Sequence, residues 1–137
     1  MMKKNKLLTK SEERVMDFLW EKEDPVTISD IEQYFKKKNL TKATAFKAVQ
    51  SLLNKNCICV NGVERATKTY ARRFSPMITK EEYAAVLLEE RGIDINSVGN
   101  LVVAMIGNQK KTHNANTDEI VIKELKSVIQ MLRDRSK

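Results

Sequence analysis

Apolar residues recur at helical spacing in six stretches of this chain, three before and three after a central stretch of alternating residues. A Ser or Thr followed three positions later by Glu opens three of the predicted helices, at Thr9, Ser29 and Thr79. In such a capping box, two side chains bond the backbone N–H groups at the start of the helix. The pattern therefore predicts a mainly α fold.

The alternating stretch predicts a small antiparallel β-wing. Residues 57–60 and 68–74 are its two strands, Asn61-Gly62 is a turn signal, and residues 62–67 form the tip. Residues 26–28 are a β-branched run, which suits a short further strand. The small sheet is thus expected to pack beside the first three helices.

The third predicted helix begins at Thr41 and has one apolar stripe. The stripe consists of Ala45, Ala48, Val49 and Leu52. Together with the helix before it and the hairpin after it, this helix makes residues 29–74 a winged helix-turn-helix, the arrangement that lays one helix in a DNA major groove. We expect a winged-helix DNA-binding domain at residues 1–76 and a helical dimerisation domain at residues 77–137.

The distribution of charge supports this division. The net charge is +7, and residues 1–75 hold 16 Lys and Arg against 9 Asp and Glu, whereas residues 76–137 hold 9 of each. The whole positive excess therefore lies in the predicted DNA-binding part. A surface that binds a polyanion such as DNA needs this excess of positive charge.

The candidate DNA contacts lie on the polar side of the third helix and on the wing. They are Thr41, Lys42, Thr44, Phe46, Lys47, Gln50, Ser51, Arg65 and Arg73. Lys, Thr and Ser donate to phosphate oxygens or base edges, and Gln reads adenine. Phe46 suits either a thymine methyl or packing on the flank of the apolar stripe. Alternation along the second strand is expected to turn Tyr70 and Phe74 toward the core and to leave Arg73 on the open face.

The three helices after residue 76 carry more aliphatic surface than they can bury alone. The candidate dimerisation residues are Leu87, Leu88, Val98, Val102, Met105, Ile106, Leu125, Val128, Ile129 and Leu132. Pairing with a second copy would cover them, and the two-fold symmetry of a homodimer matches a palindromic operator. A ligand pocket between these helices is the alternative.

Other classes of site find little support. His113 lies in a polar loop without a neighbouring nucleophile, so we expect no enzyme and no cofactor. Cys57 and Cys59, two apart on a strand, are poorly placed to bond each other and too few for a zinc site. We expect them to pack in the sheet, unless a second subunit completes a redox or metal site. The apolar run at 101–106 is too short for a membrane span, and the N-terminus lacks a signal-peptide core, so a cytoplasmic protein is expected.

Three groups of residues resemble a known family. They are residues 8–12 with Val15-Met16 and Leu19-Trp20, residues 42–45 with 52–56, and Tyr70 with Ser75-Pro76. They resemble the penicillinase and methicillin-resistance repressors (BlaI/MecI type), a family that includes copper-transport repressors of the CopY type. The resemblance implies a homodimeric winged-helix repressor with a helical C-terminal dimerisation domain. It also implies release by a signal, which is proteolysis in the penicillinase branch and metal binding to C-terminal cysteines in the copper branch.

The chain departs from this pattern in three places. No cysteine follows residue 76, which speaks against copper sensing, Phe46 stands where the family often has a basic residue, and Asn56 replaces a usual Gly. We therefore expect a homodimeric transcriptional repressor that binds double-stranded operator DNA and is released by a regulatory protease or a small effector. The alternative is a winged-helix module that binds proteins and does not read DNA.

Overall fold

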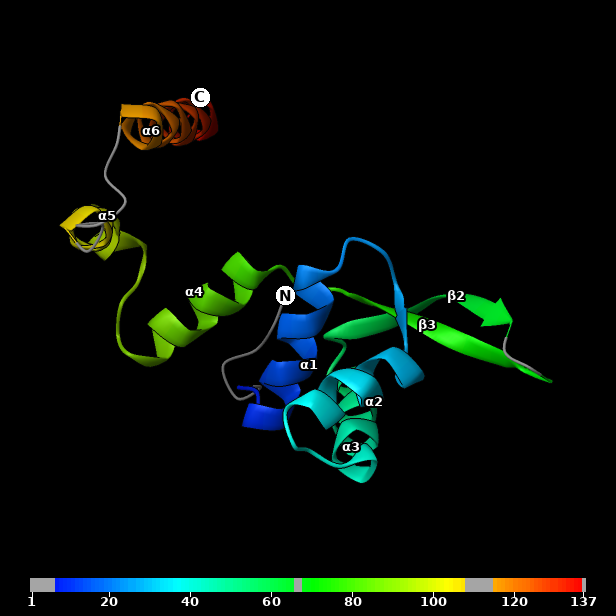
Figure 1. Cartoon of the computed structure of the whole chain (residues 1–137). Helices are drawn as coiled ribbons and strands as arrows, with labels where there is room; N and C mark the ends of the chain where they lie inside the picture. Colours follow the sequence, from blue (N-terminus) through cyan, green and yellow to red (C-terminus); the bar gives the residue numbers. More distant parts are fainter. Residues whose placement is uncertain (1–6, 66–67, 108–114, 137) are drawn as a thin grey trace. The chain divides into compact units, whose positions relative to one another are not determined.

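The computed structural model describes residues 7–65, 68–107 and 115–136. Over these residues the chain forms six α-helices, one 3-10 turn and three strands (Figure 1). In chain order they are α1 (Lys10–Glu21), β1 (Val26–Thr27), α2 (Ile28–Lys37), α3 (Lys42–Asn54), β2 (Ile58–Arg65), β3 (Tyr70–Pro76), α4 (Lys80–Glu90), the turn Ile95–Ser97, α5 (Val98–Gly107) and α6 (Ala115–Arg135). The predicted fold class, mainly α with a small β-wing, is confirmed.

Capping boxes open α1, α2 and α4, but the one on α2 differs from the prediction. Thr9 and Thr79 cap their helices as expected. In α2 the box consists of Thr27 and Asp30, not Ser29 and Glu32. The reason is that Thr27 still pairs with β3 in extended geometry, so the chain passes from strand into helix two residues earlier than the sequence pattern indicated.

The sheet is antiparallel with strand order β1-β3-β2. The predicted turn at Asn61-Gly62 is wrong, because β2 continues through both residues to Arg65, which pairs with Tyr70. The register shifts between Val60 and Val63, so Asn61-Gly62 is a β-bulge. Gly62 has φ 86°, a left-handed geometry that a bulge uses as readily as a turn does.

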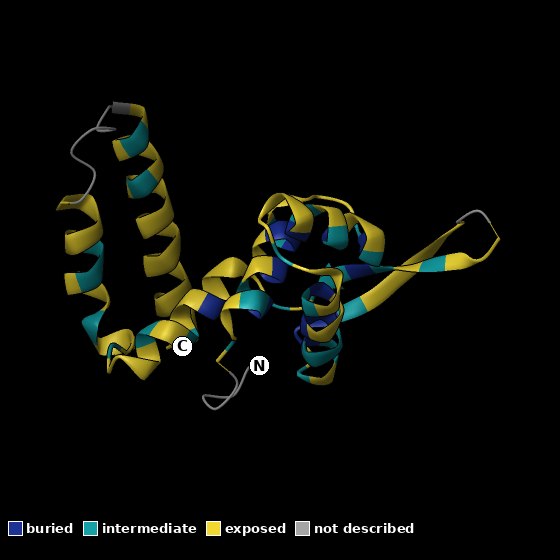
Figure 2. Cartoon of the chain, turned by 60° about the horizontal axis from the view of Figure 1, so that its bottom comes forward, coloured by how far each residue is buried: buried dark blue, intermediate teal, exposed yellow. Residues whose placement is uncertain are grey.

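One hydrophobic core joins α1, α2, α3 and the inner part of the sheet (Figure 2). The predicted stripe of α3 is buried, from Ala45 to Leu52. Phe74 is buried as predicted, but Tyr70 is 68% exposed, because the hairpin at that point has already passed beyond the helices. The expectation that Tyr70 faces the core is therefore wrong.

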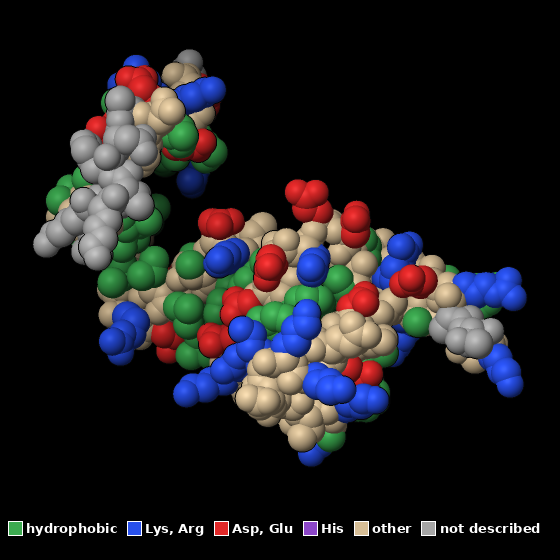
Figure 3. All heavy atoms as spheres, viewed as in Figure 1, with side chains coloured by type: hydrophobic (Ala, Val, Ile, Leu, Met, Phe, Trp, Pro, Cys, Tyr) green, Lys and Arg blue, Asp and Glu red, His purple; other side chains and the backbone are tan. Residues whose placement is uncertain are grey.

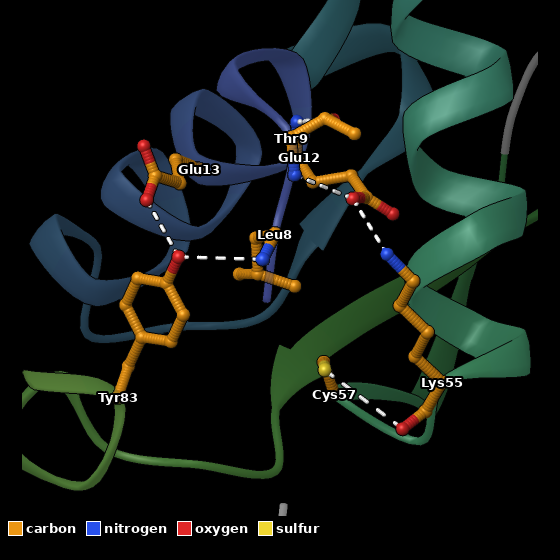
Figure 4. Close-up of polar contacts among 7 residues, drawn as sticks. All are labelled: Leu8, Thr9, Glu12, Glu13, Lys55, Cys57 and Tyr83. Carbon is orange, nitrogen blue, oxygen red and sulfur yellow. Dashed lines mark hydrogen bonds and ion pairs between the residues drawn. The ribbon is translucent and has the colours of Figure 1, made fainter. Parts of the chain in front are cut away.

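Two compact units divide the chain at Met1–Ile93 and Asp94–Lys137, whereas we predicted a boundary after residue 76. The difference arises because the segment with α4 packs on α1. The Trp20 Nε1–H donates to the Ile78 carbonyl over 2.9 Å. The Tyr83 hydroxyl donates to Glu13 over 2.6 Å, as Figure 4 shows. Burial and the Glu13 carboxylate raise the pKa of Tyr83 above its usual range.

The second unit holds the 3-10 turn, α5 and α6. Asp94 caps the 3-10 turn by accepting from the Asn96 N–H, and α5 follows it directly. None of the residues whose burial is described in this unit is buried. The predicted loop residue His113 lies outside the described residues.

Candidate nucleic-acid interface

The start of α3 is fixed by two threonines. The Thr41 hydroxyl accepts from the Thr44 N–H over 3.2 Å, and the two side-chain oxygens lie 2.8 Å apart. Lys42 and Lys47 are exposed on this helix, whereas Thr44 is half-buried. The helix therefore presents two cations and two ordered hydroxyls from a backbone that its buried stripe holds in place.

The middle of the same helix is more mixed. Gln50 and Ser51 are half-buried, and Phe46 is 54% exposed. Phe46 thus stands mostly clear of the core, which leaves its ring available for an apolar contact outside the protein. The polar residues and Phe46 together form a surface that suits both base edges and a thymine methyl.

An ion pair that the sequence did not suggest anchors the end of α3 to the start of α1 (Figure 4). Lys55 Nζ lies 2.8 Å from Glu12 Oε1, which also accepts from the Thr9 N–H over 2.8 Å. Burial opposes ionisation of Glu12, but Lys55, Ser51 and Thr9 outweigh it and hold the pKa of Glu12 below its usual value. Glu12 Oε2 is buried and makes no well-formed hydrogen bond to the described residues, although the Ser51 hydroxyl is near enough to lower the pKa.

A hollow of about 300 Å³ lies between the first turn of α1 and the polar side of α3. Its walls are Thr9, Ser11, Glu12, Thr44, Lys47, Ala48 and Ser51. Three of the predicted DNA contacts therefore border one depression, and the buried Glu12 carboxylate forms part of its wall.

The two predicted wing contacts differ in their exposure. Arg65 is exposed at the outer end of β2. Arg73 is half-buried, its Nε is shielded from solvent, and its guanidinium lies so close to Gly62 that an added Cβ would sit 2.9 Å from Nη2. The prediction that Arg73 stands on an open face is therefore wrong. Figure 3 shows basic side chains gathered at the outer end of the wing and around the lower helices.

The structure exposes most of the candidate dimerisation residues. Leu88 and Val102 are half-buried. The other eight are between 38% and 61% exposed: Leu87, Val98, Met105, Ile106, Leu125, Val128, Ile129 and Leu132. They are distributed over α4, α5 and α6.

The cysteines were also candidates for a metal or redox site. Within the described residues no group of three or more His, Cys, Asp or Glu side chains is placed to hold a metal ion. Cys57 is buried and its thiol lies 3.8 Å from the Lys55 carbonyl, while Cys59 is half-buried. No helix in the described part of the chain has the length and apolar character that a membrane crossing needs.

Two solved structures are similar to this chain at low sequence identity. Among solved structures, it is similar to the adhesin competence repressor of Streptococcus pyogenes, with 17% identity over 93% of this chain and 84% of that one, and a TM-score of 0.43. It is also similar to a point mutant of ZitR from Lactococcus lactis, with 17% identity over 91% of this chain and 75% of that one, and a TM-score of 0.39. A search of curated proteins finds no match.

The family model of the penicillinase repressor matches residues 8–131, which confirms the resemblance seen in the sequence. The chain therefore belongs to the penicillinase repressor family, and it is a DNA-binding transcriptional repressor, not an enzyme.

Proposed function

We propose that this repressor reads a palindromic operator as a homodimer, with α3 of each copy in a major groove. The observation that carries the proposal is the two-sided character of α3. Its apolar stripe is buried, while Lys42, Lys47 and Phe46 are exposed beside the ordered hydroxyls of Thr41 and Thr44. Such a helix is rigidly held and presents its chemistry outward, which is what base reading requires.

Each polar residue of α3 is assigned a role by its chemistry. Lys42 and Lys47 neutralise phosphates, the hydroxyls of Thr41, Thr44 and Ser51 donate to phosphate oxygens, and Gln50 reads an adenine edge. Phe46 contacts a thymine methyl. Because Phe46 replaces a residue that is often basic in the family, operator preference at that base pair depends on an apolar contact.

The apolar helices that follow the wing in the sequence support the proposal of a homodimer. In α6 the exposed residues Leu125, Val128, Ile129 and Leu132 recur at three- and four-residue spacing, the pattern of a helix seam. A second copy is the occupant we propose, because it offers the same seam and doubles the number of reading helices on one duplex. Two weak half-site contacts then act as one strong contact.

Release follows from this dependence on dimerisation. We propose that a regulatory signal, either proteolysis or a small effector, acts on the helices of the dimer seam and so separates the two reading helices. The repressor is proposed to work in the cytoplasm, where its operator DNA lies.

Fluorescence anisotropy with duplex DNA from upstream of the protein's own gene tests the proposal. Replacing Lys47 with Ala removes one phosphate contact from each copy and therefore two from the bound dimer, so the slope of log K against log salt should become shallower by about 1.8. Lys80→Ala removes a lysine of α4 that is also exposed and should leave the slope unchanged. Equal binding by wild type and Lys47→Ala at every salt concentration contradicts the assignment of α3.

Two further measurements complete the test. Ile129→Lys places a charge in the proposed seam and should shift the protein from dimer to monomer in sedimentation, with weaker binding to the full operator. If the wild-type protein binds no duplex at low salt but retains a protein partner, the interaction-module alternative is correct.

A further inference from the structure

The outer part of the β2–β3 hairpin carries an exposed surface that includes Arg65, which the sequence pattern predicted, and Arg72, which it did not list. Figures 1 and 2 both show this part of the hairpin projecting beyond the helices. Across it, Val63 pairs with Arg72 and Arg65 pairs with Tyr70. Residues directly opposite each other on antiparallel strands share a face of the sheet. These four side chains therefore form one face, which we call the basic wing face.

The bulge at Asn61-Gly62 decides which residues stand on this face. Val60 pairs with Phe74 on the core side, and strict alternation would continue that side with Gly62 and Glu64. The extra residue in the bulge shifts the alternation, so that Val63 and Arg65 follow Val60 instead. The bulge thus places a guanidinium beside Tyr70 and turns the Glu64 carboxylate to the opposite face.

The basic wing face combines positive charge with exposed apolar area. Arg65 and Arg72 are exposed, Tyr70 is 68% exposed and Val63 is 54% exposed. The Arg72 guanidinium lies over the Phe74 ring, 5.4 Å from its centroid, which restrains the arginine before any ligand arrives.

Arg73 lies on the face of the hairpin opposite the basic wing face, and we assign it a structural role. It pairs with β1 through Thr27, it is half-buried, and its guanidinium rests against Gly62 in the bulge. A guanidinium held in this way covers the bulge and is not free to follow a phosphate. Arg73 is therefore a positioning residue, which acts on DNA only through the bulge that it supports.

We propose that the basic wing face binds the sugar-phosphate backbone of the operator, with Arg65 and Arg72 on phosphates and Tyr70 against a deoxyribose. This inference rests on the proposed function and names the wing residues that serve it. Charge complementarity selects the occupant, because the face carries two guanidinium groups and no carboxylate, and a guanidinium fork matches two phosphate oxygens. The Tyr70 ring and Val63 suit the apolar side of a sugar.

The test compares neighbouring arginines on opposite faces of one strand. Replacing Arg72 with Ala removes a phosphate contact from each copy of the dimer, so it should reduce the salt slope of DNA binding by about 1.8 and weaken binding by more than about tenfold at 0.1 M salt. Arg72→Lys keeps the charge and should keep most of the slope. Arg73→Ala should leave the slope unchanged and lower the melting temperature. Tyr70→Ala should weaken binding without changing the slope, since it carries no charge.

Three outcomes separate this inference from the proposed function. If the wild-type protein binds no operator DNA, the proposed function itself fails. If the wild type binds but Arg73→Ala reduces the slope and Arg72→Ala does not, the assignment of faces is overturned. If neither arginine affects the slope while Lys47→Ala does, α3 reads DNA without the wing, and the basic wing face is not a DNA contact.

Discussion

Replacing Lys55 with Met removes the positive partner of a buried carboxylate. Glu12 is 2% exposed, and its Oε1 accepts from Lys55 Nζ and from the Thr9 N–H, each over 2.8 Å. Met retains the apolar stem of the lysine but cannot compensate the charge. In the variant, the Glu12 carboxylate therefore stays buried with one well-formed hydrogen bond.

The expected loss of stability follows from the burial of the two partners. Removing one member of a buried ion pair costs about 3–5 kcal/mol. Lys55 keeps 25% of its side chain exposed, so solvent already screens part of the interaction and the loss should lie near the lower end, at about 3 kcal/mol. For a unit of this size, that corresponds to a fall in melting temperature of roughly 10–20 °C.

Thermal and urea unfolding of the full chain at fixed concentration measure the effect. Glu12→Gln keeps the cap and leaves no buried charge, so it should cost only about 1 kcal/mol. The double variant Glu12→Gln/Lys55→Met should then be more stable than Lys55→Met alone, since the stranded carboxylate is gone. Lys10→Met, an exposed control in α1, should change stability by less than about 0.5 kcal/mol. A double variant as unstable as the sum of its two single changes refutes the reasoning.

The pH dependence provides an independent check on the same pair. Glu12 has a lowered pKa in the folded protein, so its contribution is complete above the ordinary value of 4.5 and is lost as the pH falls through the folded pKa. In Lys55→Met, the lysine no longer stabilises the ionised carboxylate, so burial raises the pKa of Glu12. The stability gap between the two proteins should therefore be largest near neutral pH, begin to narrow as the pH falls through the raised pKa of Glu12 in the variant, and narrow further as the pH falls through its lowered pKa in the wild type. A gap that stays constant across this range would show that the ion pair is not its cause.

Three further predictions concern packing and backbone geometry. Tyr83→Phe removes the 2.6 Å bond to Glu13 and should lower the unfolding free energy by about 1–2 kcal/mol in urea titrations, with unchanged helix content by circular dichroism. A chain that ends after Ile93 should melt at a higher temperature than one that ends after Pro76, because only the longer one retains α4 on α1; equal melting temperatures would reject this packing. Asn56 has φ 60°, so Asn56→Gly should raise stability by up to about 1 kcal/mol in thermal unfolding, whereas a loss would show that the Asn side chain contributes more than the backbone strain costs.

Interactions between residues close in sequence made much of this protein predictable. The caps at Thr9, Thr41 and Thr79 depend on side chains three positions away, and the buried stripe of α3 depends on a period of a few residues. Both were read correctly because local geometry alone produces them. Three of these residues, Thr9, Ala45 and Leu52, also belong to the motifs that carry the family resemblance, so the sequence by itself indicated a winged-helix repressor.

The tertiary structure decided what local patterns leave ambiguous. Asn61-Gly62 suits a turn and a bulge equally well, and only pairing with β3 showed that the strand continues. That single extra residue placed Arg65 on the same face as Arg72 and turned Glu64 to the opposite face.

Long-range contacts were equally hidden from the sequence. Lys55 and Glu12 are 43 positions apart, and Tyr83 and Glu13 are 70 apart. No periodicity links such residues, because they meet only after the helices have packed. The sequence therefore determined most of the helices and strands that form and indicated α3 as the helix that we propose reads DNA. The packed fold determined where the first compact unit ends, which carboxylate is buried beside α3, and which arginines of the wing are exposed.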